Sequence, residues 1–434
     1  MRGPSGKPPS AVAPVAAGSR AEIAAAAGVG VWIGTITYRG RMDLLEPAVK
    51  SYDWGSRRII ADLQGRPVPS AGPEAELWMG AHPAGPSLVR AGRGVRGLDE
   101  IVAADPPVVL GADVAARFDG RLPFLLKVLA ADKALSIQVH PDRETARAAF
   151  AAQRASGGEP GNYSDDWPKP EVLCALTPFE ALAGLREPRE AAGLLRDLQI
   201  PELEPIVRRL DAGDDEGLVD ALRMLLGRPR EQQDELLESV VAACAARVWD
   251  DGDHARAYAA VVQIAVDHPG DLGAVASLLL NHTVLQPGEA IFLAAGGLHA
   301  YLRGAGIEIV ANSDNVLRAG LTSKRIDVDE LCRIVDPTVP VPVLRPRPDA
   351  DGVTSYDADV PEFMLHRLDR EGGSVAIPGE GPRIVLNVAG VARLRCRAGV
   401  LRLERGASAF ISAADGPVTC EGAATLYVAG PGRP

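Results

Sequence analysis

The chain has 434 residues, more than one ordinary domain holds, and its 47% hydrophobic and 24% charged residues are typical of globular proteins with a sizeable core. The formal net charge of -11 argues against nucleic acid or an anionic membrane as the main partner. A small anionic substrate stays possible, because a few local cations can outweigh a distant acidic surface. No apolar run reaches the roughly 18 residues of a membrane helix, so the composition predicts a globular protein of two or three units.

The five cysteines lie far apart in the sequence and include no CxxC pair. An odd number at such spacing fits neither a disulfide framework nor a thiolate metal site. We therefore expect free thiols in a reducing compartment, which points to a cytoplasmic protein.

Residues 1–41 are rich in Ala, Gly and Pro, and Arg2, Lys7 and Arg20 loosely imitate the basic start of a secretory signal. The apolar part of this segment is diluted by glycine and lacks leucine, which argues against a signal. We expect a flexible extension, with a true start at Met42 as the alternative.

The rest of the chain divides by pattern. Short strands with turns between them dominate residues 42–186, where the apolar run LPFLLKVLA at 122–130 is typical of a buried strand. Leucines at helical spacing predict a helical insertion over 187–280. Strands joined by glycine-containing turns resume at 281–336, and 337–434 consists of a proline-rich linker and a further β domain. We expect a mainly β fold with a helical insertion.

The window SIQVHPD contains three polar side chains that alternate with apolar ones, so Ser136, Gln138 and His140 face the same way on a strand. Two such side chains can bind one ion, and histidine is a common zinc ligand, although glutamine is an unusual one. A strand-end histidine bonded to a carbonyl is an equally good interpretation of His140. Asp142 then follows as the N-cap of a predicted helix.

The window GEAIFLAAGGLHAY, residues 288–301, resembles the second cupin motif, Gly-x5-Pro-x-Gly-x2-His, with Ala294 where proline is usual. Its glycines permit a tight hairpin that returns His299 into the mouth of a β-barrel. This pattern favours a cupin-type barrel or jelly roll.

A third window, Lys169-Pro170-Glu171, precedes an alternating strand. Proline keeps its neighbour extended, so Lys169 and Glu171 can project together at the strand entrance. Taken alone, this tripeptide is more typical of a solvated charged turn.

Together and in this order, the three windows resemble the type I phosphomannose isomerase family. The resemblance covers roughly 42–333, and the last hundred residues share only its general β character. It rests on these ordered segments: YDWGS (52–56), AELWMGAHP (75–83), LPFLLKVLAADKALSIQVHPD (122–142), NYSDDWPKPE (162–171), LTPFEALAG (176–184), GEAIFLAAGGLHAY (288–301) and NSDNVLRAGLTSK (312–324).

The resemblance implies a zinc-dependent cupin enzyme with two β-barrel domains, the second one degenerate, and an α-helical domain. It implies one zinc per chain, held by Gln138, His140, Glu171 and His299. Arg318 matches the active-site arginine of the family, and we expect it on a loop after the strand that carries Glu308. The resemblance also implies that Ser136, Lys169, Glu308 and Lys324 lie around the substrate.

The implied reaction interconverts mannose 6-phosphate and fructose 6-phosphate through an enediol, with no nucleic-acid or membrane partner and a monomer as the expected state. Glu308 and Lys169 are both candidates for the general base. Lys324, Arg325 and Ser136 could bind the phosphate. Pro168 stands where many members have histidine, so a proton-transfer role for that histidine cannot operate here.

Two other classes of function are consistent with a cupin barrel. One is an Fe²⁺-dependent oxygenase, which usually has two clustered histidines and a carboxylate within one motif, unlike this chain. The other is a sugar-binding or regulatory cupin without catalysis. The presence of the complete candidate site argues against it.

Overall fold

The computed structural model describes residues 42–91, 94–156, 161–249 and 254–433. These residues all fall within one compact unit, Tyr38–Pro434. The predicted N-terminal extension, 1–41, lies outside the described residues.

An 11-stranded antiparallel sheet is built around β6 (Phe124–Ala131) and β12 (His299–Ala311). The two strands pair without a register shift from Gly304 opposite Ala131 to Ala311 opposite Phe124. Every residue of β6 is buried, which confirms the buried strand predicted from the apolar run. The other strands of this sheet are β2 (Ala48–Lys50), β3 (Glu76–Gly80), β7 (Ile137–Val139), β8 (Glu171–Ala175), β9 (Phe179–Leu185), β10 (Leu280–Leu285), β11 (Ala290–Leu293), β13 (Leu317–Gly320) and β14 (Val343–Leu344).

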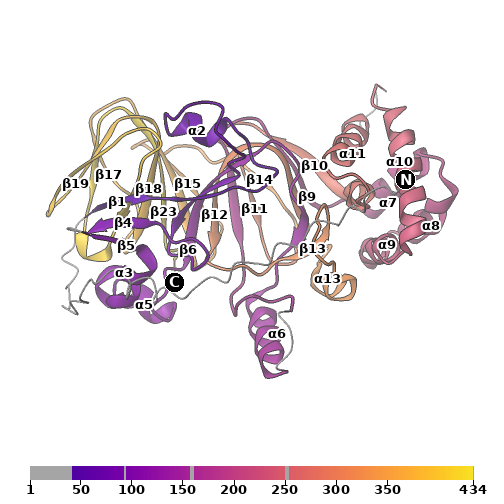
Figure 1. Cartoon of the computed structure of the whole chain (residues 1–434), viewed down its shortest axis with the longest axis horizontal. Helices are drawn as coiled ribbons and strands as arrows, with labels where there is room; N and C mark the ends of the chain where they lie inside the picture. Colours follow the sequence, from indigo (N-terminus) through magenta and orange to yellow (C-terminus); the bar gives the residue numbers. More distant parts are fainter. Residues whose placement is uncertain (1–41, 92–93, 157–160, 250–253, 434) are drawn as a thin grey trace, which may run out of the picture. The chain divides into compact units, whose positions relative to one another are not determined.

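The helical insertion leaves the sheet after β9 and returns to it at β10, two strands that pair with each other (Figure 1). Leu218, Leu222 and Leu225 are buried on α9, as their helical spacing predicts. The helices are α7 (Pro188–Asp197), α8 (Glu204–Leu210), α9 (Glu216–Leu226), α10 (Arg230–Ala245), α11 (Ala255–Asp267) and α12 (Gly273–Ala276).

The C-terminal part forms an eight-stranded and a four-stranded sheet. The eight-stranded sheet contains β15 (Val353–Tyr356), β16 (Met364–Arg370), β18 (Arg383–Gly390), β21 (Ser408–Ile411) and β23 (Ala424–Gly430), together with the N-terminal strands β1 (Asp43–Glu46), β4 (Leu88–Ala91) and β5 (Gly94–Gly97). The four-stranded sheet contains β17 (Ser374–Ala376), β19 (Ala392–Cys396), β20 (Gly399–Leu403) and β22 (Thr419–Glu421).

The strands of one sheet do not all come from one continuous segment of the chain. β1 pairs with β21, so the first strand of the predicted catalytic segment completes the C-terminal sheet and satisfies the hydrogen-bonding groups of its edge. The predicted proline-rich linker is wrong in one respect, because its residues 343 and 344 form β14 and pair with β11. The predicted division at residues 186, 280 and 336 stays a prediction.

The two large sheets pack against each other through one hydrophobic core. Leu126 and Val128 of β6 and Ile307 of β12 contribute to it from one sheet, and Leu386 and Tyr427 contribute from the other. Because side chains alternate along a strand, the opposite face of β6 and β12 is left for other uses.

The remaining helices lie at the edges of the sheets. Asp142 caps α6 (Arg143–Ala155), as predicted, and its side chain accepts a hydrogen bond of 2.7 Å from the Thr145 amide. Among the described helices, none is long and apolar enough to cross a membrane. The other helices are α2 (Ile59–Leu63), α3 (Leu98–Ala104), α4 (Pro106–Leu110), α5 (Ala112–Arg117) and α13 (Val328–Ile334).

Replacing Gly304 with alanine should destabilise the protein, because β12 passes very close to the start of β9 at this residue. A Cβ atom at Gly304, whose φ is +131°, would lie 2.8 Å from both Phe179 Cδ2 and the Pro178 carbonyl oxygen. We expect a loss of about 1–3 kcal/mol in the free energy of unfolding, measured as a lower melting temperature.

Gly372→Ala is the matched control, since Gly372 also has a positive φ, +153°, but a Cβ atom added there would meet no other atom within 4 Å. A melting temperature lowered equally in both variants would contradict the close-contact explanation. The positive φ that the two glycines share would then be the cause of the destabilisation.

Candidate metal centre and substrate pocket

Three neighbouring strands place candidate site residues in one row. His299 of β12 lies opposite Gln138 of β7, and Gln138 lies opposite Arg318 of β13. Directly paired residues project from the same face of a sheet. The expectation that Arg318 lies on a loop is therefore wrong, because residues 317–320 pair with β7 and extend the sheet.

His140, Glu171 and His299 converge at the end of this row. Their ligand atoms all lie within 4.8 Å of one another, and all three side chains are buried. His140 Nε2 lies 3.3 Å from Glu171 Oε1, and His299 Nε2 lies 3.6 Å from Glu171 Oε2. This is the one such group of His, Cys, Asp or Glu in the part of the chain that the structure describes.

Backbone carbonyls fix the orientation of both imidazole rings. His140 Nδ1 donates to the Asn315 carbonyl at 2.7 Å, and His299 Nδ1 donates to the Gly297 carbonyl at 3.0 Å. With the proton on Nδ1, the Nε2 lone pair of each ring is directed at Glu171. Both interpretations of the His140 window therefore hold at once: one ring nitrogen bonds a carbonyl and the other is free for an ion.

The donor set fits a divalent transition metal. His140 Nε2 and Glu171 Oε2 are buried and make no hydrogen bond with the described residues, an arrangement that is costly unless an ion binds. Two imidazoles and a carboxylate are typical zinc ligands. The Gln138 side-chain nitrogen lies 3.3 Å from His299 Nε2, and a rotation of the amide would direct its oxygen there instead.

The charges around the cluster are closely balanced. Burial raises the pKa of Glu171, but the Lys169 ammonium at 2.9 Å and the adjacent histidines hold it well below its usual range. Burial, together with the nearby Lys169 charge, lowers the pKa of His140 to about 4, although Glu171 opposes this effect. His140 is therefore neutral at physiological pH, the form that binds metals.

A second ion pair lies farther along the same face. Lys127 Nζ is 2.8 Å from Glu308 Oε2 and 3.6 Å from Glu76 Oε1. Burial raises the pKa of Glu308 above its ordinary value, although Lys127 opposes this effect. Glu308 is 2% exposed, so it is a buried and not a surface carboxylate.

Sequence reasoning overlooked Lys127 and Tyr301. Lys127 lies within the apolar run at 122–130. It is the one charged residue in this predicted buried strand, and that exception could have indicated a functional role. The Tyr301 hydroxyl is buried without a hydrogen-bond partner among the described residues, and burial raises its pKa well above the ordinary value.

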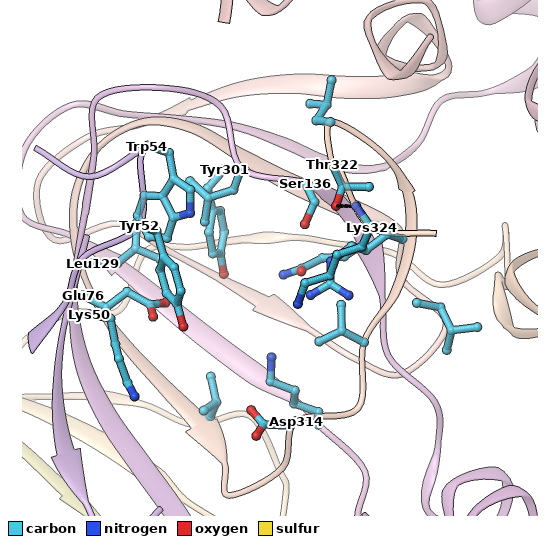
Figure 2. Close-up of a pocket in the computed structure, with 18 of the residues that line it drawn as sticks. Lys50, Tyr52, Trp54, Glu76, Leu129, Ser136, Tyr301, Asp314, Thr322 and Lys324 are labelled. Carbon is cyan, nitrogen blue, oxygen red and sulfur yellow. Dashed lines mark hydrogen bonds between the residues drawn. The ribbon is translucent and has the colours of Figure 1, made fainter. Parts of the chain in front are cut away.

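A cavity of about 1160 Å³ opens above the cluster. Figure 2 shows Ser136, Thr322 and Lys324 on one side and Tyr52 and Glu76 on the other. Gln138, Lys169, Glu171, Glu308 and Arg318 also line the cavity. His140 and His299 do not line it, and both are buried next to Glu171.

Cations gather on the Ser136 side of this cavity. Burial lowers the pKa of Arg318. The pKa of Lys324 is lowered mainly by the charge of Arg318. Since the two cations repel each other, an anion between them is favoured.

Comparisons with known proteins agree with this geometry. A family model described as "Phosphomannose isomerase type I, catalytic domain" matches residues 42–188. Mannose-6-phosphate isomerase of Escherichia coli (strain K12) is 37% identical over 389 residues, which cover 88% of this chain and 97% of that protein. The Mus musculus protein of the same name is 35% identical over 353 residues, 75% of this chain and 81% of its own length.

Solved structures give the same result. A variant of phosphomannose isomerase from Salmonella typhimurium matches with a TM-score of 0.83 at 35% identity and covers 90% of this chain and 100% of its own. A mannose 6-phosphate isomerase bound with zinc and yttrium matches with a TM-score of 0.82 at 35% identity and the same coverage. The similarity extends through the C-terminal sheets, where the sequence pattern is weak.

His299→Ala should abolish stoichiometric binding of a divalent ion, because one of few ligands is lost from a buried site. We expect about one Zn²⁺ per chain in the unchanged protein, by elemental analysis after dialysis, and a small fraction of that in the variant. His254→Ala is the control, because His254 lies in the helical insertion away from the cluster. Full zinc content in the His299 variant would contradict the assignment.

Proposed function

This chain belongs to the type I phosphomannose isomerase family, and on that premise we propose that it interconverts D-mannose 6-phosphate and D-fructose 6-phosphate with one bound zinc ion. The supporting observation is the pair of buried, unpartnered atoms, His140 Nε2 and Glu171 Oε2, at the base of a cavity that also contains Arg318 and Lys324.

His140, Glu171 and His299 would hold the zinc, with Gln138 as a fourth ligand after rotation of its amide. Zinc bound there supplies Lewis acidity, which polarises the sugar carbonyl. Lys169 positions Glu171 through their 2.9 Å ion pair. A general-base role suits Lys169 less well, because its ammonium is engaged by this carboxylate.

Glu308 is the general base that we propose to move the proton between the C1 and C2 carbons. Glu308 lines the cavity, and burial raises its pKa above the ordinary value, which makes the carboxylate a stronger base. Lys127 donates a hydrogen bond of 2.8 Å to this carboxylate and fixes its orientation.

Arg318, Lys324 and Ser136 bind the anionic parts of the substrate. Arg318 lies opposite Gln138, a proposed zinc ligand, so its donors would stabilise the enediolate oxygens of a sugar bound there. Lys324 and Ser136 lie on the same side of the cavity and would bind the 6-phosphate, with Arg325 nearby.

A coupled assay that follows fructose 6-phosphate formation from mannose 6-phosphate tests the proposal directly. Turnover should require zinc and disappear after chelation. Two histidines and a carboxylate also suit Fe²⁺, so metal analysis and oxygen uptake separate an oxygenase from the isomerase. Zinc-loaded protein without isomerase turnover would contradict the proposed reaction.

The expected monomer and cytoplasmic location remain proposals. All five cysteines are free thiols, in keeping with a reducing compartment. Light scattering on the purified chain measures the oligomeric state.

Arg318→Lys should lower kcat by about a hundredfold or more with little change in KM, because lysine cannot supply the planar pair of donors in the transition state. Lys324→Ala should instead raise KM, since a phosphate contact acts in ground and transition state alike. An unchanged kcat in the Arg318 variant, with zinc bound, would remove this residue from the chemistry.

Glu308→Gln should lower kcat by about 10²- to 10⁴-fold while zinc content stays at one per chain, because the amide cannot accept the proton. Glu76→Gln is the matched control, since Glu76 also faces Lys127, at 3.6 Å. A Glu308 variant that keeps most of its kcat would move the role of base to another residue, with Lys169 the next to test.

A further inference from the structure

A second cavity, of about 620 Å³, adjoins the substrate pocket at its phosphate side. The two cavities share a wall, which is made of the end of α11 and the loop after β13. Residues 267, 268 and 322–325 line both cavities, whereas Arg230 and Gln233 of α10 line the second cavity alone.

The second cavity contains more unpaired cations than unpaired anions. The side chains of Arg230, Lys324 and Arg325 make no hydrogen bond or salt bridge within the part of the chain that the structure describes. The two carboxylates of the cavity are already engaged. Asp267 accepts hydrogen bonds from the Ala134 amide and from Gln263, at 3.3 and 3.1 Å.

Asp271 is the second engaged carboxylate. It accepts bonds of 2.8 Å from the Gly273 amide and 2.9 Å from the Thr322 amide. Its charge is therefore directed at the backbone rather than at the cavity. Lys324 also serves the substrate pocket, so Arg230 and Arg325 are the cations left to the second cavity, and in a chain whose net charge is -11 they produce a local positive potential.

The shared wall is hydrogen-bonded to two segments on the phosphate side of the substrate pocket. His268 Nε2 donates to the Ala134 carbonyl at 2.6 Å, two residues before Ser136. Asp271 holds the Thr322 amide, two residues before Lys324. A ligand in the second cavity would therefore contact the loop that carries Lys324 and the residue, His268, that bonds to the segment before Ser136.

We propose that the second cavity is a binding site for a phosphate group, either inorganic phosphate or the phosphate of a small metabolite, separate from the catalytic pocket and coupled to it through residues 322–325. The guanidinium groups of Arg230 on α10 and Arg325 on the loop both line this cavity and suit the dianion through charge-assisted bonds. This site goes beyond the proposed isomerase reaction, which needs one phosphate site.

Calorimetric titration of the zinc-loaded full chain with inorganic phosphate tests the site. With the catalytic pocket filled by saturating mannose 6-phosphate, phosphate should still bind at about one site per chain. Arg230→Ala should weaken that binding about tenfold or more, the loss expected for one charge-assisted contact. In steady-state assays, phosphate should also change kcat at saturating substrate, and Arg230→Ala should remove this effect.

Arg256→Ala is the matched control, because Arg256 is an exposed arginine of the helical insertion that lines neither cavity. It should bind phosphate like the unchanged protein. Arg230 is exposed, so its variant should keep the melting temperature and the turnover without phosphate.

If a sugar phosphate is the natural occupant, mannose 6-phosphate itself will titrate with two sites per chain and Arg230→Ala will leave one. Purely competitive inhibition by phosphate, with one mannose 6-phosphate site, would overturn the proposal. Residual phosphate binding that Arg230→Ala does not weaken would overturn it as well. Both titrations measure binding, so they test the second site even if the chain fails to isomerise its proposed substrate.

Discussion

The buried carboxylate of Glu171 is the group to which the rest of the site must adapt. A desolvated charge without compensation costs several kcal/mol, and Lys169, His140 and His299 all lie within 4 Å of it. Lys169 neutralises the charge, while the carbonyl bonds of the two imidazoles keep a proton on each Nδ1 and direct each Nε2 at the carboxylate. The same arrangement that makes Glu171 tolerable inside the protein therefore leaves a binding position for a cation.

One strand connects this site to the stability of the fold. β12 carries Tyr301 and Glu308 to the pocket and His299 to the buried cluster, and Ile307 and Ile309 on either side of Glu308 belong to the core between the sheets. A shift of one residue in the pairing of β12 would exchange the two sets. The hydrophobic core thus fixes the register that the site requires, and substitutions in that core should affect activity through geometry.

The helical insertion has a comparable role at the phosphate side. Its corner at His268 and Asp271 bonds to the backbone before Ser136 and before Lys324. Gly273 and Gly320 approach each other closely there, since a Cβ on Gly320 would lie 2.6 Å from the Gly273 Cα. Because the segments of Ser136 and Lys324 are both bonded to this one corner, a ligand beside it can influence substrate binding.

Local features of this protein could be predicted from neighbouring residues in the chain. The alternation of polar and apolar residues predicted β7 and the shared direction of Ser136 and Gln138, and the apolar run predicted β6. Both predictions succeed because the two-residue period of a strand and its burial depend on residues that are neighbours in the chain. Ordered motifs were enough to predict the family. Only the tertiary structure decided that Arg318 lies on a strand beside Gln138, that Lys127 meets Glu308, and that β1 pairs with β21. These are contacts between residues far apart in the chain, and their formation depends on how whole strands pair rather than on any local pattern.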